Sequence, residues 1–146
     1  MQLPREVAVG NGTLNLIGDV CKRLNFLDSV LLITGRKTFH IAGQKVIDLL
    51  EEAGLAVDCF IANSQIPTAD DVRNVEERIE KWRPQVVLGV GGGTKIDLAK
   101  LSSARQGIPF ISVPTTASHD GMASPFASLR GLDRPYSVKA QSPMAV

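Results

Sequence analysis

The sequence predicts an α/β fold in which helices cover both faces of a mainly parallel sheet. Short apolar segments alternate along the chain with segments whose apolar residues recur at helical spacing, and this alternation is typical of a parallel sheet. The short segments are also hydrophobic almost throughout, as strands buried on both faces are. The 146 residues suffice for a sizeable core, so we expect one domain over residues 1–146.

The expected strands and helices follow one another in regular order. Strands are predicted at residues 6–9, 29–34, 56–61, 86–90 and 109–113, and helices at residues 14–24, 39–53, 69–82 and 94–104. Gly54 suits the C-terminal cap of the second helix, and Pro84 ends the third. The charged residues of the third helix, among them Glu76 and Arg78, are interpreted as a solvent-facing side. After Pro114 we expect a polar loop, a β-hairpin of residues 126–129 and 136–140, and the start of another strand at residues 143–146.

The composition argues against several classes of partner and site. A net charge of +1 and an aromatic content of 5% provide neither the field nor the stacking surface that nucleic acids favour. Cys21 and Cys59 lie in apolar segments, where we expect small hydrophobic thiols rather than a disulfide framework or a metal site. Because we find no signal peptide and no apolar run of membrane-spanning length, we expect a cytoplasmic protein without stable membrane insertion.

The most informative segment is the glycine run between the fourth strand and the fourth helix. Gly91, Gly92 and Gly93 follow the apolar residues 86–90 and precede a helical pattern. Glycines let a phosphate approach the backbone, and the free N–H groups and dipole of a helix N-terminus favour its charge. The spacing matches neither G-x-G-x-x-G nor the P-loop. The run therefore predicts a phosphate site, with a plain glycine-rich turn as the alternative.

The residues that follow the glycines are open to more than one interpretation. Thr94 and Asp97 have the spacing of a capping box, which favours a structural role for Asp97 over a catalytic one. Lys100 lies two turns into the helix, from where it reaches a ligand only in part. His40, in the second helix, is interpreted as structural.

Two further segments follow strands whose carboxyl ends should border the same crevice. Gly35, Arg36 and Lys37 follow the second strand, where an enzyme restricted to NAD favours an acid. The two cations would accept a 2′-phosphate through charge-assisted hydrogen bonds, or they are surface charges at a helix start. After the fifth strand, residues 114–121 bring together hydroxyls, His119 and Asp120, and Asp120 has the chemistry to hold a substrate hydroxyl.

Two motifs resemble a known superfamily. The sequences G-G-G-T-K-I-D-L-A-K at residues 91–100 and P-T-T-A-S-H-D-G-M-A-S-P at residues 114–125 are similar to those of the iron-containing alcohol dehydrogenase, glycerol dehydrogenase and dehydroquinate synthase superfamily. The second motif is most similar to the sn-glycerol-1-phosphate dehydrogenase branch. The resemblance implies a Rossmann-like N-terminal cofactor domain, followed in the family by a helical C-terminal domain that is absent from this chain.

The resemblance also implies roles for individual residues. Gly91, Gly92 and Gly93 match the diphosphate loop, and Asp120 matches an acidic position beside the substrate, which makes it the catalytic and substrate-binding candidate. Thr115, Thr116 and Ser118 match the segment along the nicotinamide, and Ser124 lies near the same opening. The cofactor-binding residues that we expect are Gly35, Arg36, Lys37, Gly91, Gly92, Gly93, Thr94, Asp97, Thr115, Thr116, Ser118 and Ser124.

The implied activity is the NAD(P)-dependent interconversion of dihydroxyacetone phosphate and sn-glycerol 1-phosphate for archaeal-type membrane lipids. In the family an Asp and two His of the C-terminal domain hold a catalytic zinc, so its ligands are expected outside this chain. The chain alone should therefore be inactive, and the full-length enzyme is expected to be a homo-oligomer. The alternatives are a dehydroquinate-synthase-like lyase domain and a non-catalytic dinucleotide-binding module.

Overall fold

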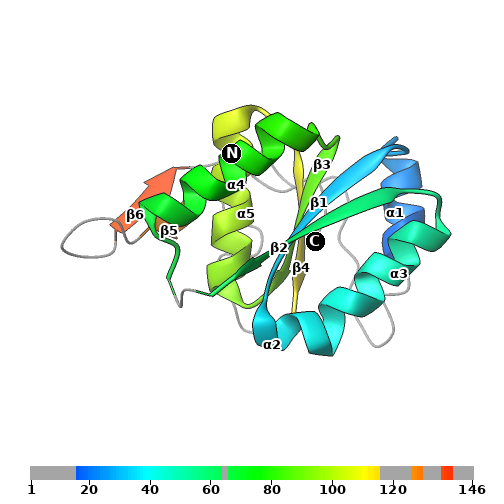
Figure 1. Ribbon diagram of the computed structural model, residues 1–146, viewed down its shortest axis with the longest axis horizontal. Coiled ribbons are helices and arrows are strands. Elements are labelled where there is room, and N and C mark those ends of the chain that lie inside the picture. Colours follow the sequence, from blue (N-terminus) through cyan, green and yellow to red (C-terminus); the bar gives the residue numbers. More distant parts are fainter. Residues whose placement is uncertain (1–15, 64–65, 116–125, 130–135, 140–146) are drawn as a thin grey trace.

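The computed structural model describes residues 16–63, 66–115, 126–129 and 136–139, and its main element is a parallel sheet. Strands β1 (Ser29–Gly35), β2 (Ala56–Ala62), β3 (Val86–Gly91) and β4 (Phe110–Pro114) lie in the order β2-β1-β3-β4. Helices α1 (Ile17–Arg23) and α3 (Gln44–Glu52) cover one face, and α4 (Ala69–Trp82) and α5 (Gly93–Gln106) cover the other (Figure 1). These layers confirm the predicted α/β, Rossmann-like class.

The sheet is buried on both faces because each strand is apolar at consecutive positions. Val30 and Leu32 of β1 pack with α1 and α3, whereas Leu31 and Ile33 of the same strand pack with α4 and α5. All four side chains are fully buried. Successive side chains of a strand point to opposite faces, so an unbroken apolar run fills two cores at once. The same alternation holds in β3, where Val86, Leu88 and Val90 pack on one face and Val87 packs on the other.

Most predicted elements are confirmed, and their ends differ by a few residues. The helix predicted at residues 39–53 begins earlier, as α2 (Arg36–Thr38), continues through one π-helical turn, η2 (Phe39–Gly43), and becomes α3. The predicted hairpin is present as antiparallel β5 (Phe126–Leu129) and β6 (Tyr136–Lys139). The strands predicted at residues 6–9 and 143–146 lie outside the described residues.

The interpretation of the charged side of α4 as solvated is wrong for three of its residues. Asp71 accepts a hydrogen bond from the Thr68 backbone N–H and closes a capping box at the start of the helix. Arg78 Nη1 lies 2.9 Å from Asp58 Oδ2 of β2, and the partly buried Glu76 pairs with Arg105 of α5. Neighbouring elements that the sequence pattern does not reveal thus provide partners for these charges.

Helix α5 lies unusually close to β3. A Cβ atom on Gly89 would stand 2.9 Å from Ala99 Cβ and 3.2 Å from Ile96 Cα. Real Cβ contacts are not made at such distances, so this approach requires glycine in the middle of the strand. Gly89 therefore fixes the height of α5, including its first turn, above the sheet.

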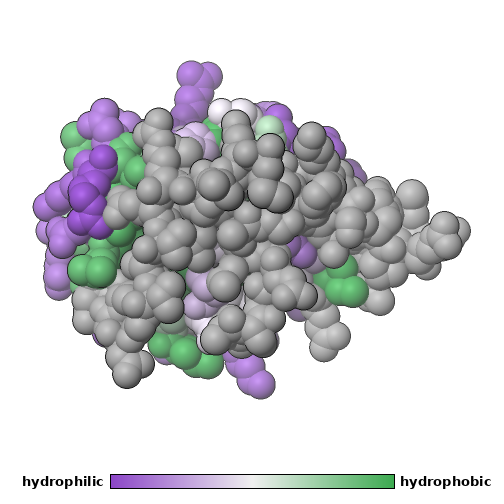
Figure 2. All heavy atoms as spheres, turned by 180° about the vertical axis from the view of Figure 1, so that it is seen from behind, coloured by the Kyte–Doolittle hydropathy of each residue, from purple (hydrophilic) through white to green (hydrophobic). Residues whose placement is uncertain are grey.

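The described surface mixes hydrophilic and hydrophobic side chains, as Figure 2 shows for the face opposite to that of Figure 1. The exposed large apolar residues come from different elements: Leu16, Leu27, Ile41 and Ile61. Singly scattered apolar residues are normal on protein surfaces. Among the described residues, no helix has the length and apolar character needed to cross a membrane.

Candidate functional site

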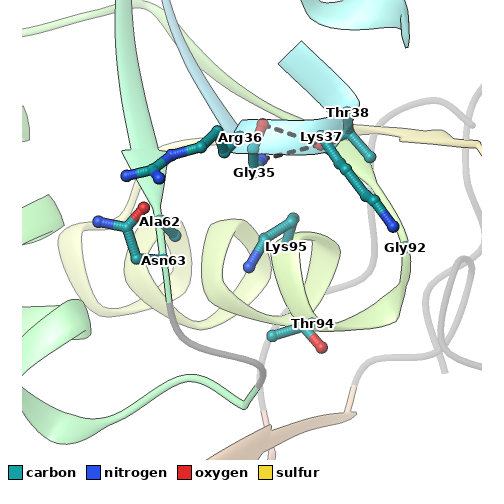
Figure 3. A pocket seen from close by; sticks show the side chains of 9 residues that line it. All are labelled: Gly35, Arg36, Lys37, Thr38, Ala62, Asn63, Gly92, Thr94 and Lys95. Carbon is teal, nitrogen blue, oxygen red and sulfur yellow. Dashed lines mark hydrogen bonds between the residues drawn. The ribbon is translucent and has the colours of Figure 1, made fainter. Parts of the chain in front are cut away.

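A cavity of about 600 Å³ opens at the carboxyl edge of the sheet. It lies between the ends of β1 and β2 and the first turn of α5, and its walls are drawn in Figure 3. The chain runs from β1 outward to β2 on one side and from β3 outward to β4 on the other, so the strand order reverses between β1 and β3. Open α/β sheets bind ligands at this switch point. The residues that line the cavity are Gly35, Arg36, Lys37, Thr38, Ala62, Asn63, Gly92, Thr94 and Lys95.

The glycine run, residues 91–93, borders the cavity where β3 ends and α5 begins. Gly91 has a φ of +146°, which side chains rarely tolerate. Gly92 is the N-cap of the helix, and a Cβ atom there would meet nothing within 4 Å, so its backbone faces open space. The free N–H groups of the first turn and the positive end of the helix dipole lie at this point. This geometry leaves room for the phosphate site that the glycines predict.

The predicted capping box of Thr94 and Asp97 is wrong. The helix begins at Gly93, one residue earlier than expected, and its N-cap makes no side-chain hydrogen bond. Asp97 lies inside the helix, 8% exposed, and Lys100 is fully buried. Burial lowers the pKa of Lys100, and the carboxylate of Asp97 acts against that shift. Neither side chain is among those that line the cavity.

The opposite wall is the abrupt junction of β1 and α2. Thr38 Oγ1 accepts a hydrogen bond from the Gly35 backbone N–H at 2.8 Å (Figure 3). It also lies 2.7 Å from Thr34 Oγ1. The Thr38 hydroxyl therefore binds the backbone where the strand becomes a helix, without an intervening loop. Arg36 and Lys37 follow directly, both exposed, on the rim of the cavity.

Lys95 is the most enclosed cation of the cavity. Its side chain crosses the ends of two strands: a Cβ atom on Gly35 would stand 2.6 Å from Lys95 Cε, and one on Gly91 would stand 3.1 Å from Lys95 Cγ. Burial lowers the pKa of Lys95, and the Asp71 carboxylate partly opposes this shift. The Lys95 ammonium is thus partly shielded from water near the N-terminus of α5.

The structure brings together five of the predicted site residues: Gly35, Arg36, Lys37, Gly92 and Thr94 all line the cavity. Gly91 and Gly93 flank Gly92, and the Thr115 backbone N–H donates to the Gly91 carbonyl at 2.9 Å, which places the start of the next loop beside the glycines. Four other predicted site residues, Thr116, Ser118, Asp120 and Ser124, lie outside the described residues, as does His119.

Sequence reasoning missed the contributions of Thr38, Asn63 and Lys95 to this cavity. A lysine in the first turn of a helix has the pattern of a surface residue, and only the strand order places it beside Gly35. The threonine three residues after a strand-ending glycine was the available signal for the capping contact of Thr38. Within the described ranges, no group of three His, Cys, Asp or Glu side chains is arranged to hold a metal ion.

Fold and site define an α/β protein with a cavity lined by cationic side chains at the switch point of a parallel sheet. The chain belongs to the iron-containing alcohol dehydrogenase family, whose model matches residues 8–146. This match confirms the resemblance of the two sequence motifs.

Among similar proteins are glycerol-1-phosphate dehydrogenases of archaea. The chain is 47% identical over all 146 residues to the glycerol-1-phosphate dehydrogenase (NAD(P)+) of Methanosarcina barkeri and covers 40% of that protein. It is 44% identical to the protein of the same name from Pyrococcus furiosus and covers 41% of it. The chain thus spans about two fifths of the length of these relatives.

Solved structures of the family share the fold at lower identity. The NADH-dependent butanol dehydrogenase A of Thermotoga maritima superimposes with a TM-score of 0.90 at 21% identity, over 99% of this chain and 42% of that one. Glycerol dehydrogenase from Schizosaccharomyces pombe gives a TM-score of 0.84 at 20% identity, over 99% of this chain and 36% of that one. The arrangement of sheet and helices is therefore one that these two solved structures share.

Proposed function

We propose that residues 1–146 form the NAD(P)-binding domain of a dehydrogenase that interconverts dihydroxyacetone phosphate and sn-glycerol 1-phosphate. The observation that supports cofactor binding is the cavity at the switch point, where an open helix N-terminus faces three cationic side chains. The similarity to glycerol-1-phosphate dehydrogenases over the whole chain supports the choice of reaction. The complete enzyme would act in the cytoplasm, in the synthesis of archaeal-type membrane lipids.

The cofactor diphosphate fits the space above Gly92. Because no atom lies within 4 Å of a Cβ position at this glycine, phosphate oxygens can approach the backbone N–H groups of the first turn. The adenosine ribose would then lie toward the ends of β1 and β2, where Gly35 adds no side chain and Arg36 is exposed. A cofactor in this position runs from the glycine loop along the carboxyl edge of the sheet.

The same cavity favours NADP(H) at least as strongly as NAD(H). A site restricted to NAD uses an acid at this strand end to bind the ribose 2′-OH, whereas the described residues that line the cavity include three cations and no carboxylate. A 2′-phosphate gains charge-assisted hydrogen bonds from such a wall. Loss of one of them should weaken NADPH binding by about 1.5–3 kcal/mol, which is the range for hydrogen bonds to charged groups.

Reduction of the ketone needs groups that the described part of the chain does not contain. We assign the zinc of the complete enzyme, which would polarise the substrate oxygen as a Lewis acid, to ligands outside this chain. Asp120 is proposed to hold a substrate hydroxyl under the nicotinamide, and Thr115, Thr116, Ser118 and Ser124 to line the nicotinamide side. The complete enzyme is proposed to be a homo-oligomer.

The test uses the complete protein that contains this chain. NADPH and NADH are titrated by fluorescence, and oxidation of NADPH is then followed with dihydroxyacetone phosphate and added zinc. We expect saturable binding of both cofactors and a product that an sn-glycerol-3-phosphate dehydrogenase does not oxidise. The Arg36→Ala variant should lose affinity for NADPH more than for NADH.

Two outcomes would replace this proposal by its alternatives. Turnover of a dehydroquinate synthase substrate, without reduction of dihydroxyacetone phosphate, would identify a lyase. Cofactor binding without turnover of either substrate would identify a dinucleotide-binding module. Wild-type kinetics in an Asp120→Asn enzyme would remove that residue from the site.

A further inference from the structure

We propose that Lys95 and Arg36 together form the subsite for the 2′-phosphate of NADP(H), and that Lys37 instead serves the diphosphate. This inference rests on the proposed function, because it divides the cations of the proposed cofactor cavity between two phosphate groups. It changes the expectation from sequence, in which the neighbours Arg36 and Lys37 act as a pair. The reason is the direction in which the side chains of Arg36, Lys37 and Lys95 extend.

The first step is the direction of the Lys95 side chain. Lys95 leaves the first turn of α5, crosses Gly91 at the end of β3 and reaches Gly35 at the end of β1. Its Nζ lies 3.6 Å from the position that a Cβ atom on Gly35 would occupy. The ammonium is therefore carried away from the glycine loop and toward the strand end that faces the ribose.

The second step is the position of the other two cations. In Figure 3, Arg36 extends toward Ala62 and Asn63 at the end of β2, and the nitrogen of Lys95 points into the cavity on that same side. Lys37 extends the other way, toward Gly92. Arg36 and Lys37 thus extend toward different ends of the cavity, although they are adjacent in sequence. Lys95 comes from α5, and its ammonium points to the same end as Arg36.

The third step is the electrostatic environment. The described residues that line the cavity include no acid, so a bound phosphate faces cations on this wall. The carboxylate of Asp71, in α4, acts on Lys95 from outside this lining. Lys95 is partly buried, and this burial lowers its pKa. Attraction between charges is stronger where water is excluded, so a phosphate at this end gains more from Lys95 than from an exposed lysine.

The experiment measures NADPH and NADH affinities of the complete protein by calorimetry for three methionine variants. Lys95→Met keeps the length of the stem across Gly35 and Gly91 but removes the charge. It should weaken NADPH binding by about tenfold or more and leave NADH binding within about twofold of wild type. Lys37→Met should weaken both cofactors by similar factors, and Lys45→Met, on the exposed side of α3, should change neither.

The outcomes of these titrations test the division of the cations and the proposed function separately. Equal losses of NADPH and NADH in Lys95→Met, or a change of their ratio in Lys37→Met alone, would overturn the division of the cations. Failure of the wild-type protein to bind either cofactor would instead overturn the proposed function. Circular dichroism verifies folding, and if Lys95→Met does not fold, Lys95→Gln is measured under the same criteria.

Discussion

Replacing Gly89 by alanine tests whether the close approach of α5 to β3 holds the candidate site in place. The new methyl group would stand 2.9 Å from Ala99 Cβ and 3.2 Å from Ile96 Cα. Neither neighbour is the end of a flexible side chain, so the helix itself has to move. Gly89 is not among the residues with positive φ, so its backbone accepts alanine and the effect is one of packing.

The expected cost follows from these contacts. Insertion of a methyl group into a filled core costs about 1–3 kcal/mol. Replacement of glycine by alanine also restricts the unfolded chain, which returns about 0.4–1 kcal/mol. The mid-range values, about 2 and about 0.7 kcal/mol, leave a net loss of about 1.3 kcal/mol in the free energy of unfolding. The first turn of α5 contains Thr94 and Lys95, so NADPH affinity should fall as well.

Urea unfolding, followed through the fluorescence of Trp82, measures the loss, since this is the only tryptophan of the chain. Ala99→Gly removes the methyl group at 2.9 Å, and this change alone costs about 1 kcal/mol through lower helix propensity. The double variant should lose less than the sum of the two single losses, although the Ile96 backbone still limits the rescue. An unchanged stability of Gly89→Ala, or strict additivity in the double variant, would refute the packing argument.

Three further predictions concern the same helix. Gly92→Val should abolish most cofactor affinity while the protein stays folded, because the branched side chain enters space that is open in the structure; unchanged affinity in a fluorescence titration would contradict the diphosphate placement. Lys100→Met should lower the free energy of unfolding by about 3–5 kcal/mol, since it leaves the buried Asp97 carboxylate without its cation, and adding Asp97→Asn should recover part of that loss in chemical denaturation. The preference for NADPH over NADH should decline as pH rises, because only the Lys95 ammonium attracts phosphate. Burial lowers the pKa of Lys95, so the decline should begin below pH 10.5, the pKa of an ordinary lysine. Lys95→Arg, which stays protonated in this range, should keep the preference in a pH series.

The sequence was sufficient wherever one local signal determined the structure. The continuous apolar run of residues 29–34 can only be buried on two faces, and β1 is found there. Apolar residues at helical spacing place α4 at Ala69–Trp82, as predicted. The glycine run likewise marks the start of α5 to within one residue, because few other residues suit a strand that turns directly into a helix.

The sequence was insufficient where the structure depends on segments distant along the chain. That Lys95 lies beside Gly35 follows from the pairing of β1 with β3, which no local pattern specifies. Arg78 and Glu76 form ion pairs with residues of β2 and α5. In the sequence, this side of α4 has only the charge pattern of a solvent-facing surface, because those partners are distant along the chain. Thr94 is not the cap, because Gly92 is the N-cap and the helix begins at Gly93.

The passage of Lys95 over Gly35 makes these two positions interdependent in evolution. Because Lys95 Cε fills the place where a side chain at position 35 would begin, any larger residue there requires the lysine to move or to be lost. An acid at position 35 would meet this ammonium directly and pair with it, which would close the cavity to a 2′-phosphate and leave a carboxylate suited to ribose hydroxyls. Cofactor preference in this lineage would then change through correlated substitutions at positions 35 and 95, and homologous sequences should show the two residue types varying together.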